Sequence, residues 1–161
     1  MKKIILSLFL MLSVYISKAQ NASVDKIASA YIGVKNALVG SNATLAKTRS
    51  KELLDAFSSI KDLTPAQQKT VNIYLDKLKF DSRHISETTK IDHQREHFQS
   101  LSNNMYSMLS ALKLNGTTLY QQYCPMKKAA WLSESKDIRN PYYGNDMLEC
   151  GTVKATLAAA K

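Results

Sequence analysis

Four sulfur-containing side chains lie close together in the last quarter of the chain. Cys124 and Met126 flank Pro125, and Met147 precedes Cys150 by three residues. Thiolate and thioether ligands favour soft monovalent ions such as Cu(I) and Ag(I) over hard cations. A spacing of three residues allows one helical turn to place two sulfur atoms on the same side. The pattern therefore indicates a soft-metal site built from Cys124, Met126, Met147 and Cys150.

Each part of this sulfur pattern also has a simpler interpretation. Two cysteines in an oxidising compartment ordinarily form a disulfide, and methionines commonly fill irregular gaps in a core. Binding of Cu(I) needs reduced thiols, which an oxidising compartment opposes. Zinc is disfavoured because neither cysteine belongs to a Cys-x-x-Cys pair. The residues alone leave a metal site and a structural disulfide as alternatives.

The chain has three histidines, His84, His93 and His97. His93 and His97 are four residues apart and can share one face of a helix, but they lack the glutamate that follows the first histidine in metalloproteases. We expect His93 to be solvated. His97 lies at the edge of an apolar stripe and could supply a nitrogen ligand to a metal held by the sulfur residues. The alternative for His97 is a hydrogen-bonded histidine at the core boundary.

An arginine is expected to face inward in the same stretch. Arg95 precedes Phe98, a residue of the apolar stripe, by three positions. A buried arginine needs an acidic or carbonyl partner. We therefore expect Arg95 to anchor the C-terminal part of the chain through Asp137, Asp146 or Glu149.

No enzyme signature accompanies these residues. The sequence has no nucleophile elbow, no phosphate-binding glycine loop and no histidine-rich zinc motif, so we do not expect an enzyme. The net charge of +9 comes from basic residues that are interleaved with acidic ones along the chain. This distribution is typical of solvated helix faces and does not favour nucleic acid as a partner.

The first 19 residues have the pattern of an export signal. Lys2 and Lys3 precede an apolar run over residues 4–16, and Ser17-Lys18-Ala19 forms a small-x-small cleavage site. Cleavage after Ala19 would place the protein in the periplasm or outside the cell. No later stretch has the roughly 18 apolar residues of a membrane span. Residues 20–161 have the length of a single domain.

The part of the chain that must position these side chains, residues 20–115, is predicted to be mainly helical. Residues 20–115 carry apolar side chains at steps of three and four, which predicts four amphipathic helices. Thr64-Pro65-Ala66-Gln67 is a capping box, Ser41 or Asn42 can cap the second helix, and Asp92 is the expected cap of the fourth. Short connections between such helices favour an antiparallel four-helix bundle.

The pattern changes after residue 115. Residues 116–153, here called the C-terminal segment, are rich in aromatic residues and are interrupted by proline and glycine. We expect short extended stretches at residues 117–124 and 129–132 and a turn at residues 140–144. The alanine-rich tail, residues 154–161, is expected to be helical or frayed. The predicted fold is therefore mainly α, with short β-strands in an irregular C-terminal segment.

Several stretches resemble the uncharacterised periplasmic domain family DUF3347 (domain of unknown function). They are Tyr31–Leu38, Gln94–Phe98, Tyr120–Met126, Trp131–Ser133, Asn140–Gly144 and Met147–Gly151. Members occur alone after a signal peptide or fused to the C-terminal side of adaptor subunits of copper/silver efflux pumps. The resemblance spans residues 24–153. One departure is the short connection of four residues between Met126 and Trp131, where many members have a longer one.

The resemblance implies a helical periplasmic module that handles heavy metals, chiefly copper. It implies metal ligands at Cys124, Met126, Met147 and Cys150, with His97 as a further candidate, and an efflux adaptor subunit as the partner. The leading hypothesis is therefore a module that binds Cu(I) or Ag(I) and passes it on. The alternative is a periplasmic protein-interaction module without metal, in which a Cys124–Cys150 disulfide of roughly 3 kcal/mol staples the C-terminal segment.

Overall fold

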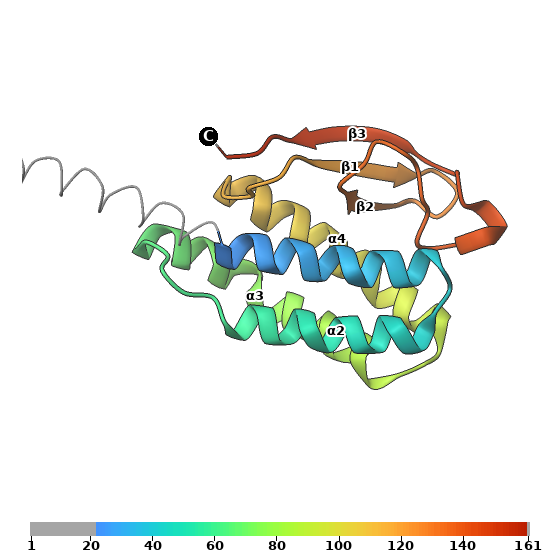
Figure 1. Cartoon of the computed structure of the whole chain (residues 1–161), viewed down its shortest axis with the longest axis horizontal. Coiled ribbons are helices and arrows are strands. Elements are labelled where there is room, and N and C mark those ends of the chain that lie inside the picture. The colour runs from blue at the N-terminus through green and yellow to red at the C-terminus, as the bar shows by residue number, and fades with distance from the viewer. Residues whose placement is uncertain (1–21, 161) are drawn as a thin grey trace, which may run out of the picture.

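The computed structural model describes residues 22–160, so the predicted signal peptide lies outside the described residues. Four long helices make up most of this part of the chain. They are a first helix at residues 22–39, α2 (Ala43–Ser58), α3 (Pro65–Glu87) and α4 (Ile91–Leu112). Figure 1 shows them lying along one another with short connections, each antiparallel to the next. The prediction of an antiparallel four-helix bundle is confirmed.

Local sequence signals set two of the three helix starts that were predicted. The side chain of Asn42 accepts a hydrogen bond from the N–H of Leu45 at 2.9 Å and caps α2. Thr64 and Gln67 form the predicted capping box at the start of α3. These side chains satisfy N–H groups that the first helical turn leaves without partners.

The predicted cap of α4 is wrong. This helix begins at Ile91, its N-cap is Lys90 without a side-chain hydrogen bond, and Asp92 lies within the first turn. The connection is held from inside instead, because the buried amide of Gln94 donates to the carbonyls of Thr88 at 2.9 Å and Ile85 at 3.2 Å. The same amide donates to the carbonyl of Ala43 at the start of α2 at 2.9 Å, so hydrogen bonds from a buried side chain replace the local cap that the sequence suggested.

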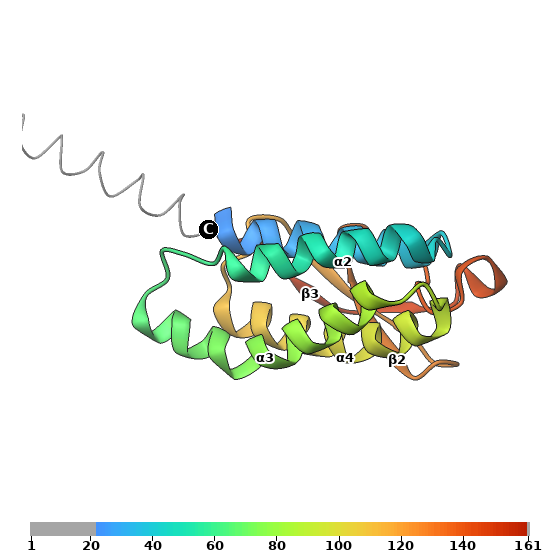
Figure 2. The same ribbon diagram turned by 90° about the horizontal axis from the view of Figure 1, so that it is seen from below.

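The apolar stripes of the helices meet in one core. Its fully buried side chains include Tyr31, Leu38, Leu53, Phe57, Leu78, Ile85, Phe98, Leu101 and Met105. Figure 2, seen from below, shows α2 and α3 on the side of the bundle away from the strands. Within residues 22–160, no helix is both long and apolar enough to cross a membrane.

A small sheet covers the opposite side of the bundle. β1 (Leu119–Cys124), β2 (Ala129–Ser133) and β3 (Thr152–Leu157) form an antiparallel sheet in the order β2-β1-β3. The first two strands confirm the predicted extended stretches. The expectation of a helical or frayed tail is wrong, since residues 152–157 pair with the edge of β1 that faces away from β2. Backbone pairing with a distant strand overrides the local preference of an alanine-rich stretch.

Buried contacts join the sheet to the helices. The hydroxyl of Tyr31 in the first helix lies 2.7 Å from Ser102 of α4 and accepts a hydrogen bond from the N–H of Leu132 in β2. Tyr142, which precedes the short 3-10 helix η1 (Gly144–Met147), packs against Trp131 and Phe98. The C-terminal segment is therefore packed onto α4, and the predicted turn at residues 140–144 lies within it.

The two ends of the elongated molecule differ. At one end, the N–H of Gly116 donates to Asp25 at 2.6 Å and the N–H of Ala160 donates to the carbonyl of Asn115 at 2.8 Å. At the other end lie the connection from α3 to α4 and the turn from β1 to β2 (Figure 1). His84 near the end of α3, His93 near the start of α4 and Cys124 at the end of β1 lie near this second end.

Candidate metal centre

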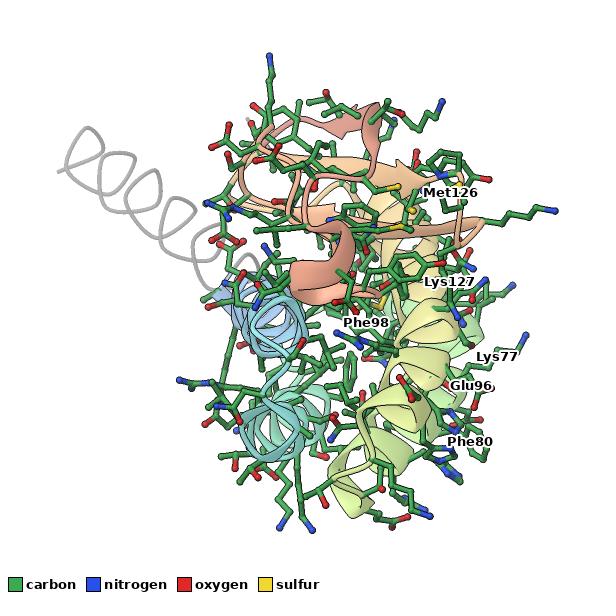
Figure 3. All side chains as sticks on the ribbon, turned by 90° about the vertical axis from the view of Figure 1, so that its right-hand side faces the viewer. Lys77, Phe80, Glu96, Phe98, Met126 and Lys127 are labelled. Carbon is green, nitrogen blue, oxygen red and sulfur yellow. The ribbon has the colours of Figure 1, made fainter. Side chains whose placement is uncertain are left out.

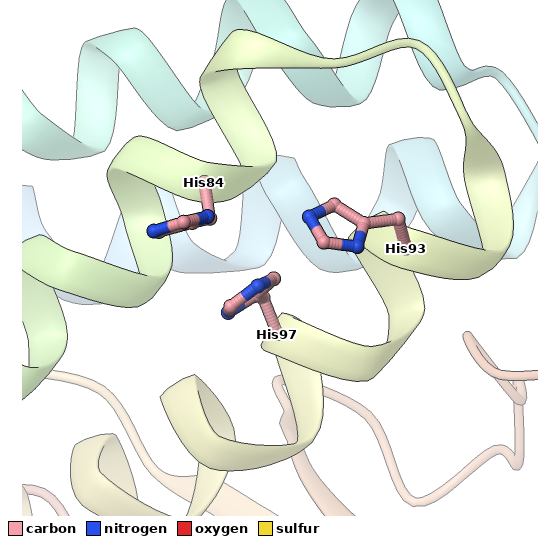
Figure 4. Close-up of side chains that lie close together, drawn as sticks. All are labelled: His84, His93 and His97. Carbon is pink, nitrogen blue, oxygen red and sulfur yellow. The ribbon is translucent and has the colours of Figure 1, made fainter.

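Three histidines gather on the surface formed by α3 and α4. His84 lies near the end of α3, and His93 and His97 lie one turn apart near the start of α4 (Figure 4). Each can offer one ring nitrogen, and these atoms lie within 4.8 Å of one another. The ring of His97 stacks on that of His84, with 4.4 Å between centroids, and meets His93 edge-on at 4.8 Å. We call this group the histidine trio.

A buried carboxylate fixes the orientation of one member. Nδ1 of His97 lies 2.9 Å from Oδ1 of Asp81, whose side chain is only 5% exposed. Because the carboxylate accepts a hydrogen bond, Nδ1 carries the hydrogen and Nε2 is left with its lone pair. A histidine that binds a metal commonly donates its other nitrogen to a carboxylate in this way. His97 is therefore held in the tautomer that a metal ligand needs.

The geometry of the histidine trio fits a transition-metal ion. Imidazole nitrogens suit copper, zinc, iron and nickel. Bonds of about 2.0–2.1 Å to a common ion would bring the nitrogens to about 3.3 Å from one another. Side-chain rotation can supply this closure, because the side chain of His93 is 43% exposed. The three histidines could therefore hold a metal ion at a position open to solvent.

An exposed aromatic ring borders the trio. Phe80 lies one turn before His84 on α3, and their ring centroids are 4.3 Å apart. The Phe80 ring also meets His97 edge-on at 5.8 Å, and Phe80 is 56% exposed. Its position leaves an apolar wall on one side of the histidines, while water and ions can reach the other.

The two cysteines meet at the end of β1. Cys124 is the last residue of this strand and is fully buried, and Cys150 lies half-buried two residues before β3. Both are free thiols, and their Sγ atoms lie 3.0 Å apart. We call them the thiol pair. The structure thus brings together two of the sulfur atoms that the sequence suggested as metal ligands.

Hydrogen-bond donors surround the buried sulfur. Burial raises the pKa of the Cys124 thiol, but bonds from Cys150, from the N–H groups of Lys127 and Met126 and from the amide of Asn140 outweigh it. The net result is a pKa of Cys124 below its ordinary value. The same contact raises the pKa of Cys150, because its S–H donates a hydrogen bond to the Cys124 sulfur and because a second negative charge beside that sulfur would be repelled. The first proton of the pair therefore leaves Cys124.

The two methionines do not join the thiol pair in the interior. Met126 is 65% exposed and Met147 is 40% exposed, so the interpretation of these residues as core packing is wrong. Figure 3, which looks onto this end of the molecule, labels Met126 and Lys127 beside the sheet and Glu96 and Phe80 on the helices below. Both thioethers are accessible to solvent next to the backbone that holds the cysteines.

His97 lies with the other histidines. In residues 22–160, the group of three metal-competent side chains that includes His97 contains no cysteine. A surface cleft of about 360 Å³ lies nearby, and both His93 of α4 and Lys127 of the β1–β2 turn line it. The backbone N–H of Lys127 also lowers the pKa of the Cys124 thiol. The cleft therefore extends from the histidine trio towards the turn that covers the thiol pair.

Arg95 anchors the C-terminal segment, as predicted, but through a different partner. Its Nε donates to the carbonyl of Pro141 at 3.0 Å, and its Nη2 donates to Ser41 Oγ at 3.0 Å. Burial lowers the pKa of the Arg95 guanidinium. The charge of Asp146 attracts the guanidinium only from a longer distance. A carbonyl acceptor satisfies the guanidinium without burying a second charge.

Two residues of the site were missed from the sequence, His84 and Asp81. A signal for His84 was present, because residues 88–90 connect two antiparallel helices and place the end of α3 beside the start of α4. A histidine just before that connection and two just after it must lie near one another. Asp81 is three residues before His84 and so lies on the same side of α3.

Comparison with known proteins identifies the family. The sequence model of the family described as "Protein of unknown function (DUF3347)" matches residues 27–117, which is more than half of the chain. No curated protein and no solved structure matches the chain. The matched range contains the histidine trio and Asp81, and it ends before Cys124. The chain therefore belongs to the DUF3347 family.

Proposed function

We propose that this protein is an exported metal-binding module, located in the periplasm or outside the cell, and that its ion is copper. The observation that carries the proposal is the histidine trio, whose ligand atoms lie within 4.8 Å of one another beside the buried Asp81. Imidazole ligands bind copper in both of its common oxidation states, and copper has the highest affinity in the divalent series. The export signal at residues 1–19 supports the compartment.

A histidine site suits an oxidising compartment. Neutral imidazoles stay available whether or not the cysteines form a disulfide, so the trio needs no reductant. Its exposure at His93 allows an ion to enter and leave, as handling of an ion requires. Binding of Cu(I) or Ag(I) by Cys124 and Cys150, and delivery to an efflux adaptor, form the finer part of the proposal. The contact of the two sulfur atoms supports the first of these, and family resemblance supports the second.

Metal titration of the mature protein tests the proposal. The chain that begins at Gln20 is first freed of metal with a chelator. It is then titrated with Cu(II), and with Cu(I) under reducing conditions, against a competing colorimetric chelator. We expect one equivalent to bind, with Cu(I) shifting the ring resonances of all three histidines and paramagnetic Cu(II) broadening them. Replacement of His84, His93 and His97 by alanine should abolish binding. The double variant Cys124→Ser/Cys150→Ser is the matched control, and it should keep its affinity for Cu(II).

Three results would contradict parts of the proposal in different ways. Copper binding that survives in the triple histidine variant and disappears in the double cysteine variant would move the ion to the thiol pair. Stronger binding of zinc than of copper would change the ion. Absence of binding in the wild type, whether oxidised or reduced, would remove the metal function.

The second candidate is an interaction module without metal. The observation in its favour is the contact between Cys124 and Cys150, because oxidation would staple the C-terminal segment where it packs onto α4. In that case the protein binds no metal in the titration, and reduction lowers the thermal stability of the C-terminal segment.

A further inference from the structure

The thiol pair can carry out chemistry that is independent of the histidine trio, because its two sulfur atoms differ in access to solvent. Cys124 is fully buried beneath the turn that joins β1 to β2, whereas Cys150 is half-buried. Their Sγ atoms are in contact at 3.0 Å as free thiols. A reagent from solution therefore meets Cys150 first, and Cys124 is already within reach of any product formed there.

We propose that Cys124 and Cys150 form a reversible dithiol–disulfide pair, in which Cys150 exchanges with small thiols and disulfides from solution and Cys124 is the internal partner. This proposal does not depend on metal binding. It differs from a structural disulfide because the bond is expected to open and close as the surrounding thiols change.

In the oxidising direction, the proton of Cys150 passes to the Cys124 sulfur across the 3.0 Å contact, because Cys124 holds the first negative charge but is shielded from reagents. The Cys150 thiolate then attacks one sulfur of a small disulfide, RSSR. The S–S bond of the reagent breaks, one RS⁻ leaves, and a mixed disulfide forms on Cys150. The Cys124 thiolate then attacks Cys150 Sγ, the protein disulfide forms, and the second RS⁻ leaves. The two protons from the cysteines pass to the two RS⁻ groups. The protein gives up two electrons, and RSSR becomes two RSH.

In the reducing direction, a small thiolate, RS⁻, attacks Cys150 Sγ because Cys124 is shielded, so the sulfur of Cys124 is the leaving group and a mixed disulfide stays on Cys150. A second RS⁻ then attacks the outer sulfur of this mixed disulfide, RSSR forms, the Cys150 thiolate leaves, and the protons of the two RSH pass to the two cysteines. The backbone N–H groups of Lys127 and Met126 and the amide of Asn140 lower the pKa of the Cys124 thiol. Donors of this kind stabilise a departing thiolate and speed the opening of the bond. An inert structural disulfide does not require such donors.

The surrounding backbone holds both cysteines in place before the reaction. Cys124 pairs with Ala129 at the end of the β1–β2 ladder. The carbonyl of Cys150 accepts a hydrogen bond from the amide of Asn140 at 2.9 Å. The N–H of Cys150 donates to the carbonyl of Met147 at 3.1 Å. Because both residues are fixed, closure of the disulfide requires little further ordering of the chain.

The test uses the mature protein in EDTA, with oxidised and reduced glutathione as probes. Samples are quenched with iodoacetamide and measured by intact mass. We expect wild-type protein to form the disulfide in oxidised glutathione without accumulating an adduct, and to reopen in reduced glutathione. Cys124→Ser should stop at a glutathione adduct on Cys150. Cys150→Ser should react at least about tenfold more slowly than Cys124→Ser, because Cys124 is buried.

A measurement on wild-type protein keeps the test valid if a variant fails to fold. Limited alkylation of the reduced protein, followed by peptide mapping, should modify Cys150 before Cys124. The proposal is overturned by a wild type that stays reduced in oxidised glutathione or accumulates an adduct. It is also overturned by a disulfide that resists reduced glutathione, which would mark an inert staple, or by equal alkylation of both cysteines. Because no metal is present, none of these results bears on the histidine trio.

Discussion

The histidine trio and the thiol pair lie towards the same end of the molecule but are built in different ways. The trio comes from two helices joined by three residues, and all of its rings can be reached from solvent. The thiol pair comes from residues 26 positions apart, and one of its sulfur atoms is fully buried. Helix pairing alone brings the histidines together, whereas the cysteines depend on the whole C-terminal segment.

This difference separates the conditions that each region needs. The trio requires only that α3 and α4 pack, which the buried core of the bundle ensures. The thiol pair requires the β1–β3 ladder, the β1–β2 turn and the contacts of Asn140. We therefore expect changes in the C-terminal segment to alter thiol chemistry without altering metal binding, and changes near Asp81 to do the reverse.

The largest effect is expected for Asn140→Ala. The buried side chain of Asn140 donates to the carbonyl of Cys150 and accepts from the N–H of Tyr142 at 2.8 Å. Loss of these bonds leaves two backbone groups without partners and should lower the free energy of unfolding by about 2–4 kcal/mol. Urea denaturation measures this, and alkylation of Cys124 should become faster. Asn145→Ala, at an exposed position of the same segment, is the control; equal effects of both changes would contradict the role of Asn140.

The next effect is expected for Asp81→Asn, on the side of the trio. The amide keeps the size of the side chain but removes the charge that fixes Nδ1 of His97. Loss of such a carboxylate typically lowers metal affinity by about 10–100-fold. Competition with a copper chelator measures the change. Asp76→Asn on the exposed side of α3 should leave the affinity unaltered, and reactivity of the thiol pair should not change in either variant.

A smaller effect is expected where the helical bundle and the sheet are joined. Tyr31→Phe removes the hydroxyl that links Ser102 of α4 to the N–H of Leu132 in β2. The free energy of unfolding should fall by about 1–2 kcal/mol, because the buried N–H loses its acceptor. Thermal denaturation followed by circular dichroism measures this. Tyr106→Phe, at a half-buried position of α4, should lower the free energy of unfolding by less. A larger loss in Tyr106→Phe than in Tyr31→Phe would contradict the role of the Tyr31 hydroxyl between α4 and β2.

The smallest effect concerns alkaline pH. Burial raises the pKa of Tyr31 well above its ordinary value of 10.0, so the unfolded chain loses this proton first. The contribution to stability is complete below pH 10 and is lost as the pH rises through the folded pKa. At pH 10.5 the wild type should lose roughly 0.8 kcal/mol through this group, and Tyr31→Phe should not. Tyr142, whose pKa burial also raises, adds a similar loss to both proteins.

The sequence predicts those parts of the fold that depend on local signals. The capping box at Thr64 and the extended stretch predicted from the aromatic-rich residues around Tyr120 concern neighbouring residues, and both predictions are confirmed. β3 was not predicted, because Thr152–Leu157 become a strand only through pairing with β1. Asp92 was a plausible cap by type, but Gln94 holds the turn through carbonyls up to nine residues away.

The candidate sites follow the same rule. The spacing of His93 and His97 on one helix was visible in the sequence, whereas His84 belongs to the neighbouring helix and needed the pairing of α3 with α4. The likeness of the two Cys–Met clusters to a metal site was visible too. The sequence did not show that the methionine and the cysteine of one cluster would differ in exposure to solvent. The exposure of Met126 and the burial of Cys124 depend on the turn that follows β1.

The contacts of Asp25 with Gly116 and of Asn115 with Ala160 have a practical consequence. Residues 22 and 160 leave the domain at one pole, while the histidines and cysteines lie towards the opposite pole (Figure 1). A fluorophore, an affinity handle or another domain attached beyond either residue would be separated from the chemically active pole by most of the length of the helices. Immobilised or fused forms of the protein should thus present that pole unobstructed.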